Sequence, residues 1–499
     1  MINQTCLTCS GQFSIAAADE TFYKKVAAPH PKNCPRCRLQ RRLAFRNERA
    51  LYPDECDKCH KAIISLYEPK SHLTVYCQTC WWGDDWDPAD YGQDIDWSRS
   101  LLEQYLEVRK RVPRLALVAM NSENSGYTNM CADNKDCYLL FAAENNENCS
   151  YGKLVQKCKD CFDNCFIYDS ELLYECINCR NCYRSIYLQD CQDSRECGYS
   201  IGLKGCSNVW LSNNLHNKQY YIRNKPVKPE DYPKLVAGLQ ECYVEWRKLN
   251  QDRIVKYANT IKSDDCTGDY LTDCKRVYDS YDVTSGQDIR YCTDALTPKD
   301  SYDCSFFYYN PELCYNCLSM LETYNVHYST FIFYARDVEY GDQVHNSHDI
   351  LLSSCVRNKQ YLILNKAYSE TLYKELQKKC IEKMTADGEY GELPPISHSL
   401  FAYADTVAQE YFQKDMQTVI DKSFKFTRAE QAFYDLMKLP QPTEHPELRH
   451  RRRMALRNPR TLWERQCMNQ NCHNRFHTTY APDSVERVYC ETCYQQVMY

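Results

Sequence analysis

The stretch "KDCYLLFAAENNENCSYGKLVQKCKDCF", residues 135–162, repeats a short motif at a fixed interval. Cys137, Cys149 and Cys161 follow one another at steps of twelve residues, each after a pair of charged or amide side chains. Short units of polar, small and aromatic residues bounded by Asn, Asp and Gly are typical of stacked strand-and-turn rungs. Because the interval drifts after Cys161, we expect an irregular β-solenoid, with cysteines packed inward and Asn or Asp holding the turns.

The middle of the chain is duplicated at an offset of 141 residues. The segment "NKQYYIRNK" at 217–225 returns as "NKQYLILNK" at 358–366, and "ELLYEC" at 171–176 returns as "ELCYNC" at 312–317. Each copy finishes in a charged stretch with helical periodicity, and the first of these stretches begins with proline and acidic residues, as helices often do. The sequence therefore predicts two solenoid copies in tandem, each ending in a helix.

The two ends of the chain are also duplicates, at an offset of 411 residues that becomes 413 after a short insertion. Three arginines and one cysteine of the first end recur in the second: Arg38, Arg41, Arg42 and Cys56 match Arg449, Arg452, Arg453 and Cys467. A register sustained over this length indicates a duplicated module.

These repeats predict a mainly β chain with some helix, in which zinc-ribbon-like modules flank the duplicated solenoid. We call the flanking segments the N-terminal and C-terminal modules, and the repeats the first and second copy. The expected layout is a double zinc module at 1–97, a linking helix at 98–120, copies at 121–255 and 256–390, a linker at 391–422 and a zinc module at 423–499.

The composition limits the class of protein. The chain has 499 residues, a net charge of −6 and 33 cysteines, and its start, "MINQTCLTCSGQFS", has no apolar stretch that could serve as a signal peptide. No run of eighteen apolar residues predicts a transmembrane helix. We therefore expect a cytoplasmic protein without a membrane partner, whose cysteines bind metal rather than form disulfides. With so small a net charge, any polyanion-binding surface must be local.

Paired cysteine motifs predict about three zinc ions, because two thiolates on each of two tight turns complete a tetrahedral set of four sulfurs. The predicted sets are Cys6, Cys9, Cys34 and Cys37; Cys56, Cys59, Cys77 and Cys80; and Cys467, Cys472, Cys490 and Cys493. The last two sets share a gap of 17 residues between their pairs. The C-terminal module lacks a counterpart of the first set, because His445 and Leu448 stand in place of Cys34 and Cys37.

The first copy holds a further cysteine cluster, made of Cys158, Cys161, Cys165, Cys176, Cys179 and Cys182. This run could hold another metal ion or an iron–sulfur cluster, although the fourth Cys and the Pro of a ferredoxin-type run are missing. The second copy has Met320 and Thr323 where the first has Cys179 and Cys182. Exchange for Met or Thr favours packing over metal ligation.

Both end modules carry a dense arginine cluster. A guanidinium held on a zinc-fixed frame suits phosphate, so we expect these arginines to contact the backbone of a nucleic acid, RNA or DNA. The candidate contacts are Arg36, Arg38, Arg41, Arg42, Arg46, Arg49, Arg449, Arg451, Arg452, Arg453, Arg457 and Arg460. No base-reading element accompanies them, so such binding would be independent of sequence.

Other interpretations remain open. The arginines could instead form internal salt bridges, for example with the six aspartates between Asp84 and Asp96, or contact a protein. A tyrosine-rich solenoid face, in a chain of 42 tyrosines, would suit a protein-interaction scaffold. The Asp84–Asp96 segment could also serve a metal-dependent nuclease or hydrolase, yet no established catalytic motif accompanies it.

Several longer segments resemble a cysteine-rich zinc-ribbon family of candidate-phyla bacteria with reduced genomes. They are "FRNERALY", "YGQDIDWSRSLLEQYLEV", "NKQYLILNK", "RNPRTLWERQC" and "TTYAPDSVERVYCETCY", and the resemblance extends over nearly the whole chain. It implies zinc binding and this modular layout, but no particular activity. The second copy departs from the family pattern where its cysteines are replaced.

Overall fold

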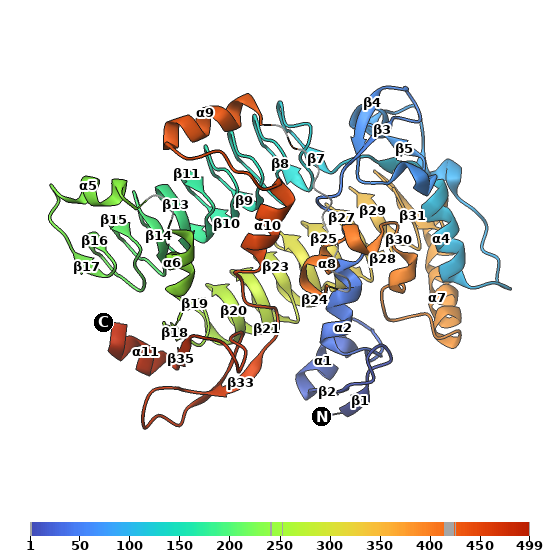
Figure 1. Ribbon diagram of the computed structural model, residues 1–499. Helices are drawn as coiled ribbons and strands as arrows, with labels where there is room; N and C mark the ends of the chain where they lie inside the picture. Colours follow the sequence, from blue (N-terminus) through green and yellow to red (C-terminus); the bar gives the residue numbers. More distant parts are fainter. Residues whose placement is uncertain (1, 240–241, 252, 414–423, 425, 499) are drawn as a thin grey trace. The chain divides into compact units, whose positions relative to one another are not determined.

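A computed structural model describes residues 2–239, 242–251, 253–413, 424 and 426–498 (Figure 1). Part of the predicted linker, residues 414–422, lies outside this range. The chain forms two compact units, each built from two separate segments. The first unit is Met1–Ala116 with Ala258–Lys414, and the second is Leu117–Tyr257 with Asp415–Tyr499. Each end module therefore belongs with the repeat copy from the opposite half of the chain.

The predicted β-solenoid is confirmed in the first copy. Its strands run parallel, and each residue pairs with the residue twelve positions later, as in Cys165↔Ile177 and Ile186↔Gly198. The strands are β7 (Ala119–Met120), β8 (Cys131–Ala132), β9 (Lys153–Gln156), β10 (Cys165–Tyr168), β11 (Glu171–Tyr174), β12 (Ile177–Arg180), β13 (Tyr183–Gln189), β14 (Gly198–Ile201), β15 (Ser207–Trp210) and β16 (Gln219–Ile222). Figure 1 shows them side by side along the copy.

Each turn of this coil is made of four triplets. Every third residue has a positive φ, as at Asp133, Asp136, Leu139 and Ala142, and the following residue points into the core. Asn and Asp fill many of these corners because they tolerate the left-handed region, as expected from the sequence. Cysteines occur at any of the four inward positions of a turn. The drift in their spacing after Cys161 therefore leaves the twelve-residue pairing intact.

The second copy has the same construction with local irregularities. A β-bulge lies between Cys266 and Gly268, and the pair Tyr302↔Tyr315 marks a turn of thirteen residues. Its strands are β19 (Thr260–Ile261), β20 (Asp264–Thr272), β21 (Lys275–Thr284), β22 (Gln287–Arg290), β23 (Thr293–Leu296), β24 (Lys299–Tyr308), β25 (Tyr315–Leu321), β26 (Tyr324–His327), β27 (Thr330–Phe333), β28 (Arg336–Glu339), β29 (Asp342–His345), β30 (His348–Leu351) and β31 (Gln360–Ile363).

Both copies end in the same way. The "NKQY" motif begins a hairpin whose short second strand, β17 (Lys225–Pro226) or β32 (Lys366–Ala367), pairs antiparallel with the last rung. This strand covers the open edge of the solenoid. The predicted terminal helices follow: α5 (Tyr232–Ala237) and α6 (Tyr243–Lys248) in the first copy, and α7 (Glu370–Ala386) in the second.

The end modules combine hairpins with short helices. The N-terminal module contains β1 (Ile2–Thr5), β2 (Gln12–Ile15), α1 (Ala17–Lys25), α2 (Pro35–Leu43), β3 (Tyr52–Glu55), β4 (Ala62–Ser65), β5 (Val75–Tyr76), α3 (Gln78–Trp82), α4 (Leu101–Arg111) and β6 (Arg114–Leu115). A short helix, α8 (Val407–Tyr411), packs against α2 in the same unit. The C-terminal module contains α9 (Arg428–Met437), α10 (Pro446–Met454), β33 (Trp463–Gln466), β34 (Arg475–Thr478), β35 (Arg487–Tyr489) and α11 (Glu491–Met498). Within the described residues, every helix is too short or too polar to cross a membrane.

Candidate metal centres

The three predicted cysteine sets each come together in space. In every set the four sulfurs lie within 4.8 Å of one another, and none of the 33 cysteines forms a disulfide. The sulfurs of Cys9 and Cys34 are 3.8 Å apart, and those of Cys472 and Cys490 are also 3.8 Å apart. Four thiolates around one zinc ion at about 2.3 Å would be separated by about 3.8 Å. The spacing of the sulfurs therefore fits a tetrahedral metal site.

We call the sets tetrads 1, 2 and 3 in chain order, and all three have the same construction. The first cysteine pair lies in the turn of a hairpin: β1–β2, β3–β4 or β33–β34. The second pair lies in the first turn of a helix: α2, α3 or α11. Helix N-termini favour negative charge, so this position stabilises thiolates.

Backbone N–H groups donate to the first sulfur of tetrads 2 and 3. The N–H of Cys77 is 3.2 Å from the Cys56 sulfur, and the N–H of Cys490 is 3.3 Å from the Cys467 sulfur. The pKa shifts of the thiols differ within the tetrads. Hydrogen bonds led by the Cys77 N–H lower the pKa of Cys56 to about 7 against the effect of burial, whereas burial raises the pKa of Cys80 and of Cys467. Sulfur ligands suit a soft cation, and an all-sulfur tetrahedral set with no open position fits structural zinc.

The cysteines of the central cluster occupy the solenoid core instead. Cys158, Cys161, Cys176, Cys179 and Cys182 are buried at inward positions, and their S–H groups reach backbone carbonyls of their own and the next turn. Met320 fills in the second copy the fully buried position that Cys179 fills in the first. Cys165 faces outward from the core, where its sulfur lies 3.6 Å from Nδ1 of His450.

Arg38 and Arg42, two of the predicted phosphate contacts, are buried against the second copy. Arg38 lies 2.9 Å and Arg42 3.0 Å from the carboxylate of Asp303, which is fully buried and itself occupies a left-handed corner of β24. Arg42 also donates to the carbonyl of Tyr291 at 3.2 Å. These two guanidinium groups thus fix α2 to the solenoid.

The C-terminal module docks on the first copy through the equivalent contacts. Arg449 and Arg453 pair with Asp163, Arg453 at 3.0 Å, and Arg453 donates to the carbonyl of Tyr151 at 3.3 Å. Asp163 and Tyr151 precede Asp303 and Tyr291 by the same 140 residues (303 − 163 and 291 − 151). Neither aspartate was predicted as a functional residue, although the sequence shows that the two occupy equivalent positions in the two copies.

The other predicted arginines are distributed over both modules. Arg36 is exposed, and its guanidinium lies over Phe412. The rest are partly or fully buried, and four of them form ion pairs: Arg41 with Glu392, Arg46 with Glu48, Arg451 with Glu447, and Arg452 with Glu175 and Glu444. The guanidinium of Arg457 lies over the ring of Phe166, and Arg49 and Arg460 are half-buried. Internal salt bridges therefore engage most of the cluster, but their acids are not those of the Asp84–Asp96 segment.

The aspartates of the Asp84–Asp96 segment have different partners and do not share one site. Asp85 pairs with Lys58, Asp87 with Lys359 and Asp94 with Lys366, while Asp96 accepts from the N–H and hydroxyl of Ser98. Within the described part of the chain, these carboxylates form no cluster that could hold a metal ion. The segment is thus bound by separate lysines.

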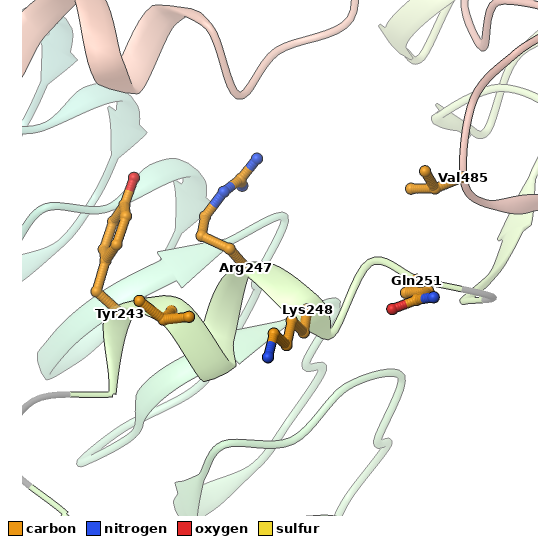
Figure 2. A pocket seen from close by; sticks show the side chains of 6 residues that line it. Tyr243, Arg247, Lys248, Gln251 and Val485 are labelled. Carbon is orange, nitrogen blue, oxygen red and sulfur yellow. The ribbon is translucent and has the colours of Figure 1, made fainter.

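A hollow of about 460 Å³ lies beside α6 in the second unit (Figure 2). Its lining comprises Tyr243, Val244, Arg247, Lys248, Gln251 and Val485. Figure 2 shows the head groups of Arg247 and Lys248 pointing in opposite directions. The two cations do not converge, so the hollow has no arrangement of polar groups suited to a charged ligand.

Comparisons with known proteins add little to this description. No protein-family model matches the chain, and no curated protein matches it. A solved structure described as a "putative acetyltransferase" from Desulfovibrio desulfuricans G20 aligns over 54% of this chain and 82% of its own, with 6% identity and a TM-score of 0.11. A likeness that low carries no argument about fold or activity.

Proposed function

We propose that this protein is a non-enzymatic scaffold stabilised by three structural zinc ions. The observation that supports it is that each tetrad adjoins an element docked on a repeat copy. Two cysteines of tetrad 1 lie at the start of α2, which docks on the second copy through Asp303. Beside tetrad 2, Trp81 of α3 packs against His345 of the second copy. Tetrad 3 packs on Ile254 of β18 (Ile254–Lys256), a strand that pairs with β35. Metal binding would thereby fix the modules on the solenoid.

Asn33 links tetrad 1 to the docked helix. Its side-chain oxygen accepts from the N–H of Thr8, at 3.1 Å, in the knuckle between Cys6 and Cys9. Its amide group donates to Glu392 at 2.6 Å, and Glu392 also accepts from Arg41. The knuckle, the start of α2 and the segment after the second copy are therefore joined through one buried amide.

Among its described residues, the second unit has no cysteine tetrad at its docking helix, α10, and a further carboxylate pairs with the arginines there. His445 caps α10 by accepting from the N–H of Glu447 at 3.2 Å. Besides Asp163, the docking arginines of this unit reach Glu175 and Glu430. The second copy has Asn316 at the position of Glu175. Glu175 is thus an additional acid of the second unit, whereas Glu430 matches Asp19 of the N-terminal module, which pairs with Arg290.

Replacing Cys34 and Cys37 together by Ser is the test of this proposal. We expect the variant to lose one of about three zinc ions. Because α2 then opens locally from the solenoid more often, the rate of amide hydrogen exchange in α2 and β24 should rise about tenfold. Peptides of α10 and β10 serve as the internal control, since the second unit keeps its tetrad. Hydrogen–deuterium exchange and metal analysis of the full chain give both readouts. Wild-type protein without zinc, or unchanged exchange in β24 after zinc is lost, would contradict the proposal.

Nucleic-acid binding is a second candidate, and the exposed guanidinium of Arg36 beside tetrad 1 favours it. The burial of Arg38, Arg42, Arg449 and Arg453 counts against these four as phosphate contacts. A salt series with single-stranded RNA and duplex DNA measures the number of phosphates contacted. If the arginines only dock the modules, as proposed above, the logarithm of the affinity does not change with the logarithm of the salt concentration, and this is the result we expect. A slope that corresponds to several phosphates, and that falls in Arg36→Ala, would instead establish nucleic-acid binding.

A further inference from the structure

An identical stripe of side chains runs along the outside of each repeat copy. In the first copy, four successive turns place the same residue types in register, with the pairings Lys159↔Glu171, Glu171↔Tyr183 and Tyr183↔Arg195. In the second copy, the pairings are Lys299↔Glu312, Glu312↔Tyr324 and Tyr324↔Arg336. We call the last three positions of each stripe, Glu171–Tyr183–Arg195 and Glu312–Tyr324–Arg336, the Glu–Tyr–Arg ladder.

The ladders are open to solvent. Tyr183 is 42% exposed and Tyr324 47% exposed, and both arginines lie on the surface. The guanidinium of Arg195 has no ion-pair partner among the described residues, and that of Arg336 is 4.0 Å from the exposed carboxylate of Asp337. Both rings and both guanidinium groups are thus accessible to a partner.

Folding alone does not account for the identity of the two ladders. The copies have diverged even in the core, where Cys179 corresponds to Met320 and Cys182 to Thr323. Surface substitutions usually change stability little, so exposed positions drift more easily than buried ones. An exposed Tyr, an exposed Arg and a Glu that is exposed in the first copy and half-buried beside Lys299 in the second are retained at successive turns of both copies. This retention indicates a surface that contacts something.

The order of charges makes the ladder complementary to itself. Successive turns are about 4.8 Å apart, so the acid and the base lie on either side of the tyrosine. A two-fold rotation centred on the tyrosine places Glu against Arg, Tyr against Tyr and Arg against Glu. In the first copy, Lys159 then faces the position of Ser207, which carries no charge.

We propose that the Glu–Tyr–Arg ladder is a self-association surface, and that its partner is another molecule of this protein. A two-fold contact of one patch with itself is the commonest way in which soluble proteins pair. Two ladders per chain give each molecule two such surfaces. This inference is independent of the zinc ions and goes beyond the scaffold proposed above.

Sedimentation velocity of the full chain over a concentration series tests this inference. We expect the mass to rise above that of the 58.9 kDa monomer with concentration, and the association to weaken with salt. Arg195→Glu combined with Arg336→Glu places acid against acid, and should weaken association about tenfold. Arg180→Glu, an exposed arginine of the first copy outside the ladder, is the matched control.

A reversed ladder separates charge pairing from misfolding. Adding Glu171→Arg and Glu312→Arg to the two arginine substitutions exchanges acid and base in both copies, and the two-fold pairing is restored. We expect this variant to associate like the wild type. A wild-type chain that stays monomeric at every concentration would overturn the proposal. So would association that survives the arginine substitutions, or that the reversal does not restore.

Discussion

Replacing Asp303 by Ala is expected to destabilise the first unit by about 3–5 kcal/mol, because it leaves two buried cations without an anion. Arg38 and Arg42 both pair with Asp303, and all three side chains are buried. Hydrogen exchange of β24 in the full chain gives the free energy of local opening. A single unfolding curve of the whole chain would not give this free energy, since the chain consists of two units.

Two comparisons sharpen this result. Asp163→Ala should cost less, because Glu175 and Glu430 remain near Arg453 and Arg449. Asp300→Ala removes a half-buried carboxylate that lies 3.2 Å from the exposed ammonium group of Lys25, and it should cost less than about 1 kcal/mol. Equal effects of Asp303→Ala and Asp300→Ala would show that the docking arginines do not hold α2 on the solenoid.

The second large effect concerns the crossed pairing of modules and copies. We expect a chain cut once, at a protease site inserted after exposed Gln251, to remain a single particle under native conditions. The N-terminal fragment would contribute 1–116 to the first unit, and the C-terminal fragment would contribute 258–414 to the same unit. The second unit is likewise shared between the fragments, so two interfaces hold them together.

The control for the cut chain removes both docking anions. With Asp303→Ala and Asp163→Ala combined, the fragments should separate or require much higher concentration to stay together. Gel filtration of the cut proteins distinguishes the two cases. If each module instead docked on the copy that adjoins it in sequence, the wild-type fragments would separate at once.

The tetrads were predictable because the ligands of a four-cysteine metal site lie at characteristic short spacings in the sequence. Two close pairs, such as Cys56/Cys59 and Cys77/Cys80, predict a tetrahedral ligand set independently of the rest of the fold. The duplicated tetrad in the C-terminal module strengthened that prediction. The solenoid was predictable as a class, since its twelve-residue interval shows clearly from Cys137 to Cys161.

The triplet period of the solenoid was harder to recognise. Its inward positions hold residues as different as Cys149, Leu173 and Ser185, so hydrophobicity alone does not trace them. The clearer signal is Asn or Asp directly before an inward cysteine, as at Asp136, Asn148 and Asp160.

The role of the arginines could not be read from their cluster. Arg42 and Asp303 are 261 residues apart, and only the folded chain brings them together. An arginine-rich helix looks the same in sequence whether it faces phosphate or a buried carboxylate. The crossed assembly is hidden for the same reason, because each end module carries the docking arginines and each copy carries a matching aspartate, Asp163 or Asp303.

The most direct test of the scaffold as a whole is the native mass of the cut wild-type chain. We predict one species, with the summed mass of both fragments and of about three zinc ions. Separate fragments would contradict the crossed assembly, and a metal-free complex would contradict stabilisation by zinc.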